Sequence, residues 1–133
     1  MTNEKHRHGG GHGPDTSEMT EEEIRAVVAT ARDYSFKVAA HAHGAEGIKR
    51  AVRGGVDTIE HASLLDDEGI RLAKQHGAYL SMDIYNTDYT QSEGKKNGVL
   101  EDNLRKDREL GDIQRENFRR AHQAGVKMVY GTD

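Results

Sequence analysis

The chain has 133 residues, the length of one ordinary domain, so a single domain is expected. Charged residues make up 32% of the chain and the net charge is −4, which argues against nucleic acid or an anionic membrane as partners. No apolar run reaches the roughly 20 residues of a membrane span and no signal peptide follows Met1, so a cytoplasmic protein is expected. The absence of cysteine excludes disulfides, thiolate metal sites and cysteine nucleophiles.

Residues 1–16 differ in composition from the rest of the chain. His6, His8 and His12 stand among glycines without hydrophobic periodicity, which is typical of a disordered segment. A metal-binding tail is the alternative interpretation of these histidines. Residues 17–133 have a regular hydrophobic pattern and are expected to form one domain.

Helical and strand patterns alternate through that domain. Thr20 and Glu23 have the spacing of a capping box, and Ile24, Val27 and Val28 lie on one face of the helix expected after them. Further helices are expected through Ile48, from an amino-terminal cap at Asp66, and along a face formed by Leu100, Leu104, Ile113, Phe118 and Ala121. Strands are expected over residues 37–44, 56–61, 78–82 and 126–130, and each helix is expected to end at a glycine.

This alternation predicts parallel strands joined by right-handed helical crossovers. Four strands and four helices amount to half of a (β/α)₈ barrel of about 250 residues, so the predicted fold class is α/β, a partial TIM-type barrel. An open doubly wound sheet would show the same alternation, but no glycine-rich phosphate fingerprint follows any strand. Because half a barrel has two unpaired edges, a homo-oligomer or a complementary barrel half is expected as partner, and a partial gene product is the alternative.

Residues able to bind a metal stand where the expected strands end. His41 and His43 close the first strand, His61 closes the second and Asp133 follows the fourth, so their side chains are expected to converge. Imidazole and carboxylate suit zinc and similar divalent metals, whereas hydrogen-bonded structural histidines are the alternative. Glu60 alternates with His61 and is expected to face the helical layer.

Three motifs, in this order, resemble the carboxyl-terminal half of a metal-dependent amidohydrolase: VAAHAHGAEGI at 38–48, GVDTIEH at 55–61 and YGTD at 130–133. The resemblance is to the Xaa-Pro dipeptidase (prolidase) and imidazolonepropionase-like branch, and it covers about residues 17–133. It implies that His41 and His61 bind the metal and that Asp133 contacts the metal and shuttles the catalytic proton. It implies substrate contact for His43 and Tyr85, with His43 in place of His41 as ligand left as an alternative.

The same resemblance implies metal-dependent hydrolysis of a carbon–nitrogen bond in a small peptide or amide, with zinc as the expected metal. Members of the family also carry a His-x-His pair on the first barrel strand and a lysine on the fourth, in a half of the barrel that this chain lacks. Little or no activity is therefore expected of the chain alone. The alternatives are a non-catalytic half-barrel that binds a metal or a partner, and a cyclic-amide hydrolase of the imidazolonepropionase kind.

Overall fold

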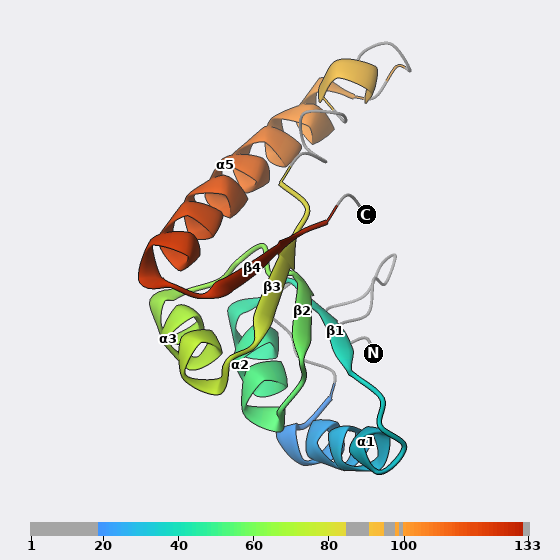
Figure 1. The fold of residues 1–133 in the computed structure, drawn as a ribbon. Coiled ribbons are helices and arrows are strands. Elements are labelled where there is room, and N and C mark those ends of the chain that lie inside the picture. The colour runs from blue at the N-terminus through green and yellow to red at the C-terminus, as the bar shows by residue number, and fades with distance from the viewer. Residues whose placement is uncertain (1–18, 85–90, 95–97, 99, 132–133) are drawn as a thin grey trace.

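The computed structural model describes residues 19–84, 91–94, 98 and 100–131 (Figure 1). In this part of the chain, four parallel strands form one sheet in the order β1-β2-β3-β4: β1 (Ala39–Ala42), β2 (Thr58–His61), β3 (Tyr79–Met82) and β4 (Lys127–Tyr130). The helices between and before them are α1 (Glu21–Asp33), α2 (Ala45–Gly54), α3 (Asp67–His76) and α5 (Glu101–Ala124). The predicted α/β fold with parallel strands is confirmed. The predicted head, residues 1–16, lies outside the described residues.

The amino-terminal caps follow the sequence. Thr20 Oγ1 accepts a hydrogen bond from the backbone N–H of Glu23 at 3.1 Å, and the Glu23 carboxylate accepts one from the Thr20 N–H at 2.9 Å. Asp66 Oδ1 accepts a hydrogen bond from the Gly69 N–H at 2.8 Å at the start of α3. These side chains pair N–H groups that have no partner inside their helices, and so fix where α1 and α3 begin.

Left-handed residues end the helices, but not always glycine. Gly55, Gly77 and Gly125 have φ values of 95°, 71° and 89° at the ends of α2, α3 and α5. After α1 the corresponding residue is Ser35, with φ of 61°, and its N–H bonds the Arg32 carbonyl at 2.9 Å. The expectation of a glycine at every helix end is therefore wrong for α1, because the hydrogen bonds of the turn hold serine in a conformation that favours glycine.

One face of the sheet packs against the helices. Ala40, Ile59 and Leu80 are neighbours in the strand register and are fully buried in the hydrophobic core. Glu60 pairs with His41 in the next register row, on the opposite face. The prediction that Glu60 faces the helical layer is wrong, because Ile59 takes that position. Figure 1 shows α2 and α3 together on one side of the sheet.

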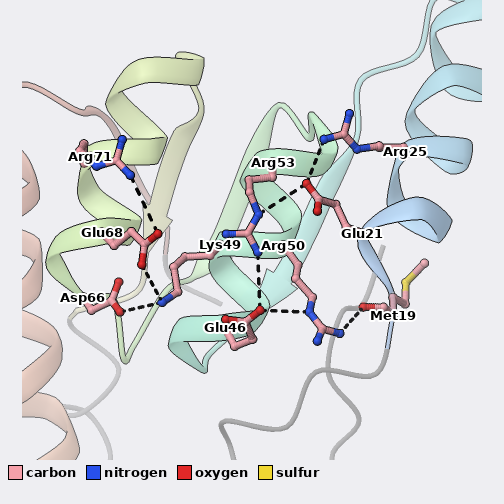
Figure 2. A network of polar contacts seen from close by, with 10 residues as sticks. All are labelled: Met19, Glu21, Arg25, Glu46, Lys49, Arg50, Arg53, Asp66, Glu68 and Arg71. Atoms are coloured by element: carbon pink, nitrogen blue, oxygen red, sulfur yellow. Dashed lines mark hydrogen bonds and ion pairs between the residues drawn. The ribbon is translucent and has the colours of Figure 1, made fainter.

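Ion pairs link α1, α2 and α3 (Figure 2). Arg53 of α2 contacts Glu21 of α1 and Glu46 of its own helix, each at 3.5 Å. Lys49 Nζ lies 3.1 Å from Asp66 and 3.4 Å from Glu68 at the start of α3. Its side chain is only 14% exposed, and the hydrogen bond to Asp66 is the main reason that the pKa of Lys49 is raised. The network therefore joins the surface ends of three consecutive helices.

The long helix α5 projects beyond the sheet at its amino-terminal end (Figure 1). Its buried face comprises Leu104, Gly111, Gln114, Asn117 and Ala121. Leu100 and Ile113, which were expected on the buried face, are 70% and 47% exposed. Among the described residues, no helix is both long enough and apolar enough to cross a membrane.

Candidate metal centre

The carboxyl ends of β1 and β2 bring His41 and His61 together. His41 Nδ1 lies 2.9 Å from His61 Nε2, and the two ring centroids are 5.0 Å apart. The His41 side chain is on the exposed side of the sheet, whereas that of His61 is 12% exposed. Two residues that are 20 positions apart in the chain thus form one pair of imidazoles at the strand ends.

An unusual backbone conformation places the His61 ring there. The register pairs His61 with Ala42, which is fully buried, so a regular strand would direct His61 toward the helical layer. Instead His61 and Ala62 have φ values of 73° and 52°, in the left-handed region that non-glycine residues rarely adopt. The chain turns at this point, and the His61 ring contacts His41.

Asp83 holds the other nitrogen of the same ring. Its Oδ1 lies 3.3 Å from His61 Nδ1, and its side chain is 11% exposed. Burial opposes ionisation of this carboxyl group, but the hydrogen bond from Gln114, a backbone hydrogen bond and the interaction with His61 together lower the pKa of Asp83. Asp83 is therefore a carboxylate at neutral pH, able to accept a hydrogen bond from the Nδ1–H of His61.

His43 packs against the ring of His61. Its ring stacks on the His61 ring with centroids 4.4 Å apart and an interplanar angle of 16°. Its Nδ1 lies 3.0 Å from the hydroxyl of Ser63, in the loop that follows β2. The two histidines that close β1 thus both contact His61, in agreement with the expectation that residues i and i+2 of a strand share a face.

Two buried amides on α5 complete the cluster. Gln114 Nε2 donates to Asp83 Oδ1 at 3.1 Å and to the His61 carbonyl at 3.3 Å. Asn117 Nδ2 donates to the Ser63 carbonyl at 3.0 Å. Neither residue is expected from the sequence to belong to the site. One signal was available, because positions 114 and 117 lie on the same helix face as Ala121, with the spacing i, i+3 and i+7.

His41 and His61 fit part of a metal site. If Asp83 fixes the proton of His61 on Nδ1, then Nε2 carries a lone pair directed at His41. Two nitrogen ligands of one tetrahedral zinc ion lie roughly 3.3 Å apart, given Zn–N bonds of about 2.0–2.1 Å, so a small ring rotation from 2.9 Å would suit both. A carboxylate behind a metal-binding histidine is also the usual arrangement in such sites.

The described residues do not supply a complete ligand set. Across residues 19–84, 91–94, 98 and 100–131, no group of three or more His, Asp or Glu side chains is placed to hold a metal ion. Asp133, the predicted third ligand, and Tyr85, a predicted substrate contact, lie outside the described residues, as do His6, His8 and His12. The structure thus brings together His41, His43 and His61 of the predicted site residues.

Comparison with known proteins gives the class to which this arrangement belongs. The model of the amidohydrolase family matches residues 9–133, so the chain belongs to the amidohydrolase family. Its four-stranded parallel sheet is accordingly part of a TIM-type barrel.

Several known proteins are similar to this chain over most of its length. Ochratoxinase from Aspergillus niger is 30% identical over 121 residues, which are 90% of this chain and 25% of the relative. The crystal structure of a Xaa-Pro dipeptidase with bound methionine in the active site is similar over 90% of this chain and 30% of that one, with 38% identity and a TM-score of 0.76. A prolidase complexed with N-methylphosphonate-L-proline matches 91% of this chain and 30% of its own, with 34% identity and a TM-score of 0.78. The chain thus spans between 25% and 30% of these relatives' length.

Proposed function

We propose that this chain belongs to a metal-dependent hydrolase that cleaves a carbon–nitrogen bond in a small peptide or amide, with zinc as the metal. The observation that carries the proposal is the pair of imidazole nitrogens, His41 Nδ1 and His61 Nε2, 2.9 Å apart at the strand ends. Family membership supports the same chemistry. In this proposal His41 and His61 hold the metal, and Asp133 is the third ligand and the proton carrier.

The chain's own residues would prepare the site in distinct ways. Asp83 keeps the proton of His61 on Nδ1, which leaves the Nε2 lone pair for the metal. His43 covers one face of the His61 ring and, with Tyr85, is proposed to contact the substrate. A divalent metal bound there supplies Lewis-acid chemistry, because it polarises a carbonyl group and lowers the pKa of water toward about 7.

A dipeptide is the substrate class that we favour. Support comes from the similar solved structures, one described as a Xaa-Pro dipeptidase and another as a prolidase. Nothing in the described residues favours a cyclic amide over a dipeptide. A cytoplasmic location also belongs to the proposal and rests on the cysteine-free composition.

A non-catalytic module is the second candidate. It requires only the arrangement that the described residues show, two adjacent imidazoles able to bind a metal. In this case the half-barrel binds a metal or a partner subunit and carries out no hydrolysis. Pairing of its open sheet edges with a second copy or a complementary barrel half is compatible with either candidate.

Zinc titration followed by a turnover assay separates the two. A background variant with His6, His8 and His12 changed to alanine removes the amino-terminal histidines as competing ligands. In that background we expect one equivalent of zinc, lost in His61→Ala and retained in His122→Ala, which changes an exposed histidine late in α5. Hydrolysis of Xaa-Pro dipeptides that also disappears in His61→Ala supports the enzyme. Zinc binding without hydrolysis, even after a complementary barrel half is added, supports the module. Zinc binding that survives His61→Ala contradicts both.

A further inference from the structure

Two amide side chains of α5 form hydrogen bonds to residues of the histidine cluster. Gln114 and Asn117 are three residues apart on the helix and are 6% and 5% exposed. Their hydrogen-bond partners lie 53 and 54 residues earlier in the chain, at the end of β2. A buried amide is costly unless its polar atoms are paired, so these contacts constrain both partners.

The orientation of each amide follows from its neighbours. The His61 carbonyl and the Asp83 carboxylate can only accept hydrogen bonds, so the atom of Gln114 that faces both must be the nitrogen. The two hydrogens of that nitrogen suffice for the two acceptors. For Asn117, the guanidinium of Arg120 donates to Oδ1 at 3.2 Å, which leaves Nδ2 for the Ser63 carbonyl.

Gln114 therefore acts on His61 twice. It holds the carbonyl of a residue whose φ of 73° is unfavourable, and it fixes the carboxylate that faces Nδ1 of the same residue. Asn117 makes a parallel link, since Ser63 carries both the carbonyl that Asn117 bonds and the hydroxyl beside His43 Nδ1. The rings of His61 and His43 are thus each connected to α5 through one intermediate residue, Asp83 and Ser63 respectively.

We propose that Gln114 is a positioning residue that selects the tautomer of His61 with the proton on Nδ1 and the lone pair on Nε2. The use of that lone pair for a metal rests on the proposed function, but the choice of tautomer does not. The link runs from Gln114 through Asp83 to His61 Nδ1, and removal of the amide donors frees both the carboxylate and the His61 backbone.

The test compares two identical substitutions on α5. Gln114→Met keeps the length of the side chain and removes its donors, and Gln123→Met makes the same change at an exposed position of the helix. Long-range ¹H–¹⁵N spectra of the metal-free chain at pH about 8.5, above the ordinary imidazole pKa of about 6.5, report which ring nitrogen carries the proton. A zinc titration of each variant, in the background that lacks His6, His8 and His12, is the second measurement.

We expect a single His61 tautomer, protonated on Nδ1, in the unchanged chain and in Gln123→Met. In Gln114→Met we expect a mixture of tautomers and a zinc affinity lower by about 10–100-fold, the usual effect of losing an outer partner of a metal-binding histidine. An unchanged tautomer in folded Gln114→Met overturns the inference. If circular dichroism shows that this variant is unfolded, Gln114→Leu removes the same amide donors with a shorter apolar side chain, and an unchanged tautomer there overturns the inference equally.

The two proposals fail in distinguishable ways. If the unchanged chain binds no zinc, the proposed metal centre fails, while the His61 tautomer still tests the role of Gln114. If zinc binds but Gln114→Met alters neither the tautomer nor the affinity, the metal centre stands and the positioning role falls.

Discussion

Ser35 and His61 hold the same rare backbone conformation for different reasons. Ser35 is exposed and follows a helix, at a position where glycine would adopt the same positive φ without strain. His61 is partly buried, and its left-handed φ directs the ring to His41 and Asp83. The strained conformation of Ser35 therefore places no side chain in the candidate site, whereas that of His61 places its ring in the candidate metal centre.

Replacing Ser35 by glycine is expected to stabilise the chain. The left-handed conformation costs a non-glycine residue about 1–2 kcal/mol, part of which is offset by the greater flexibility of glycine in the unfolded chain. We expect Ser35→Gly to raise the free energy of unfolding by about 0.5–1 kcal/mol, measured by urea denaturation. Ser35→Ala, which keeps a side chain at the same φ, serves as the control and should give no gain.

The carboxyl group of Asp66 is expected to make the stability of the fold depend on pH. Burial raises its pKa, but hydrogen bonds from the Gly69 N–H and from Lys49 outweigh this, so the pKa of Asp66 is lowered in the folded chain. A carboxyl group with a lowered folded-state pKa stabilises the fold above its unfolded pKa, and this contribution is lost as the pH falls through the folded value. Asp66→Asn keeps a good helix cap without the charge.

We expect the unchanged chain to be more stable than Asp66→Asn at pH 7, with the difference disappearing below the ordinary aspartate pKa of about 3.9. Urea denaturation of both proteins from pH 7 down to pH about 3 measures this difference. A difference that stays constant with pH contradicts the role assigned to the Asp66 charge.

At the scale of elements, α1 and α2 cross at a point that has room only for glycine. A Cβ added at Gly54 would lie 2.3 Å from Ile24 Cγ2, a fully buried side chain of α1. We expect Gly54→Ala to destabilise the chain by about 1–3 kcal/mol, the usual effect of overpacking. Ile24→Ala should remove most of that penalty, so a double-mutant cycle by urea denaturation is predicted to show strong coupling. Additive effects would show that the two helices separate freely.

The elements differ in how far the sequence predicts them. Helix starts at Thr20 and Asp66 follow from side chains a few residues away, and the strands follow from short apolar runs, so both are visible locally. The orientation of α5 is not visible in the local sequence. Polar Gln114 and Asn117 occupy its buried face, while Ile113 is exposed. Hydrophobic pattern alone misplaces a helix whose buried side makes hydrogen bonds.

The residues of the candidate site also differ in how far the sequence predicts them. The positions of His41 and His61 follow from the rule that the ends of parallel strands form a site, and their rings do lie together. Asp83 also follows a strand, but only the bend at His61 shows that this carboxyl group faces the imidazole. The spacing of Gln114 and Asn117 suits a shared helix face, but their partners lie 31 to 54 residues earlier in the chain and cannot be identified from a local pattern.

At the scale of the whole molecule, the described sheet has β1 at one edge and β4 at the other. On β4, Val129 and Tyr130 are 43% and 64% exposed, which is unusual for an apolar strand of a parallel sheet. Unpaired parallel edges with exposed apolar side chains favour association with another chain.

We expect the chain to associate with itself in solution, as light scattering over a range of concentrations can show. Val129→Lys places a charge on the edge strand and should shift the population toward the monomer. Gln123→Lys adds the same charge at an exposed position of α5 and should leave the association unchanged. A compact monomer at every concentration would falsify the expectation.

The long separation in sequence between the histidines and α5 has a consequence for biosynthesis. The ribosome releases β1 and β2 before it has made Gln114, so the imidazoles emerge before the amides that orient them exist. Chains generally begin to fold from the amino terminus during translation, at about 5–20 residues per second. For several seconds, therefore, the nascent chain presents His41 and His61 without the hydrogen bonds from α5, and under the proposed function their arrangement for a metal is complete only once α5 docks.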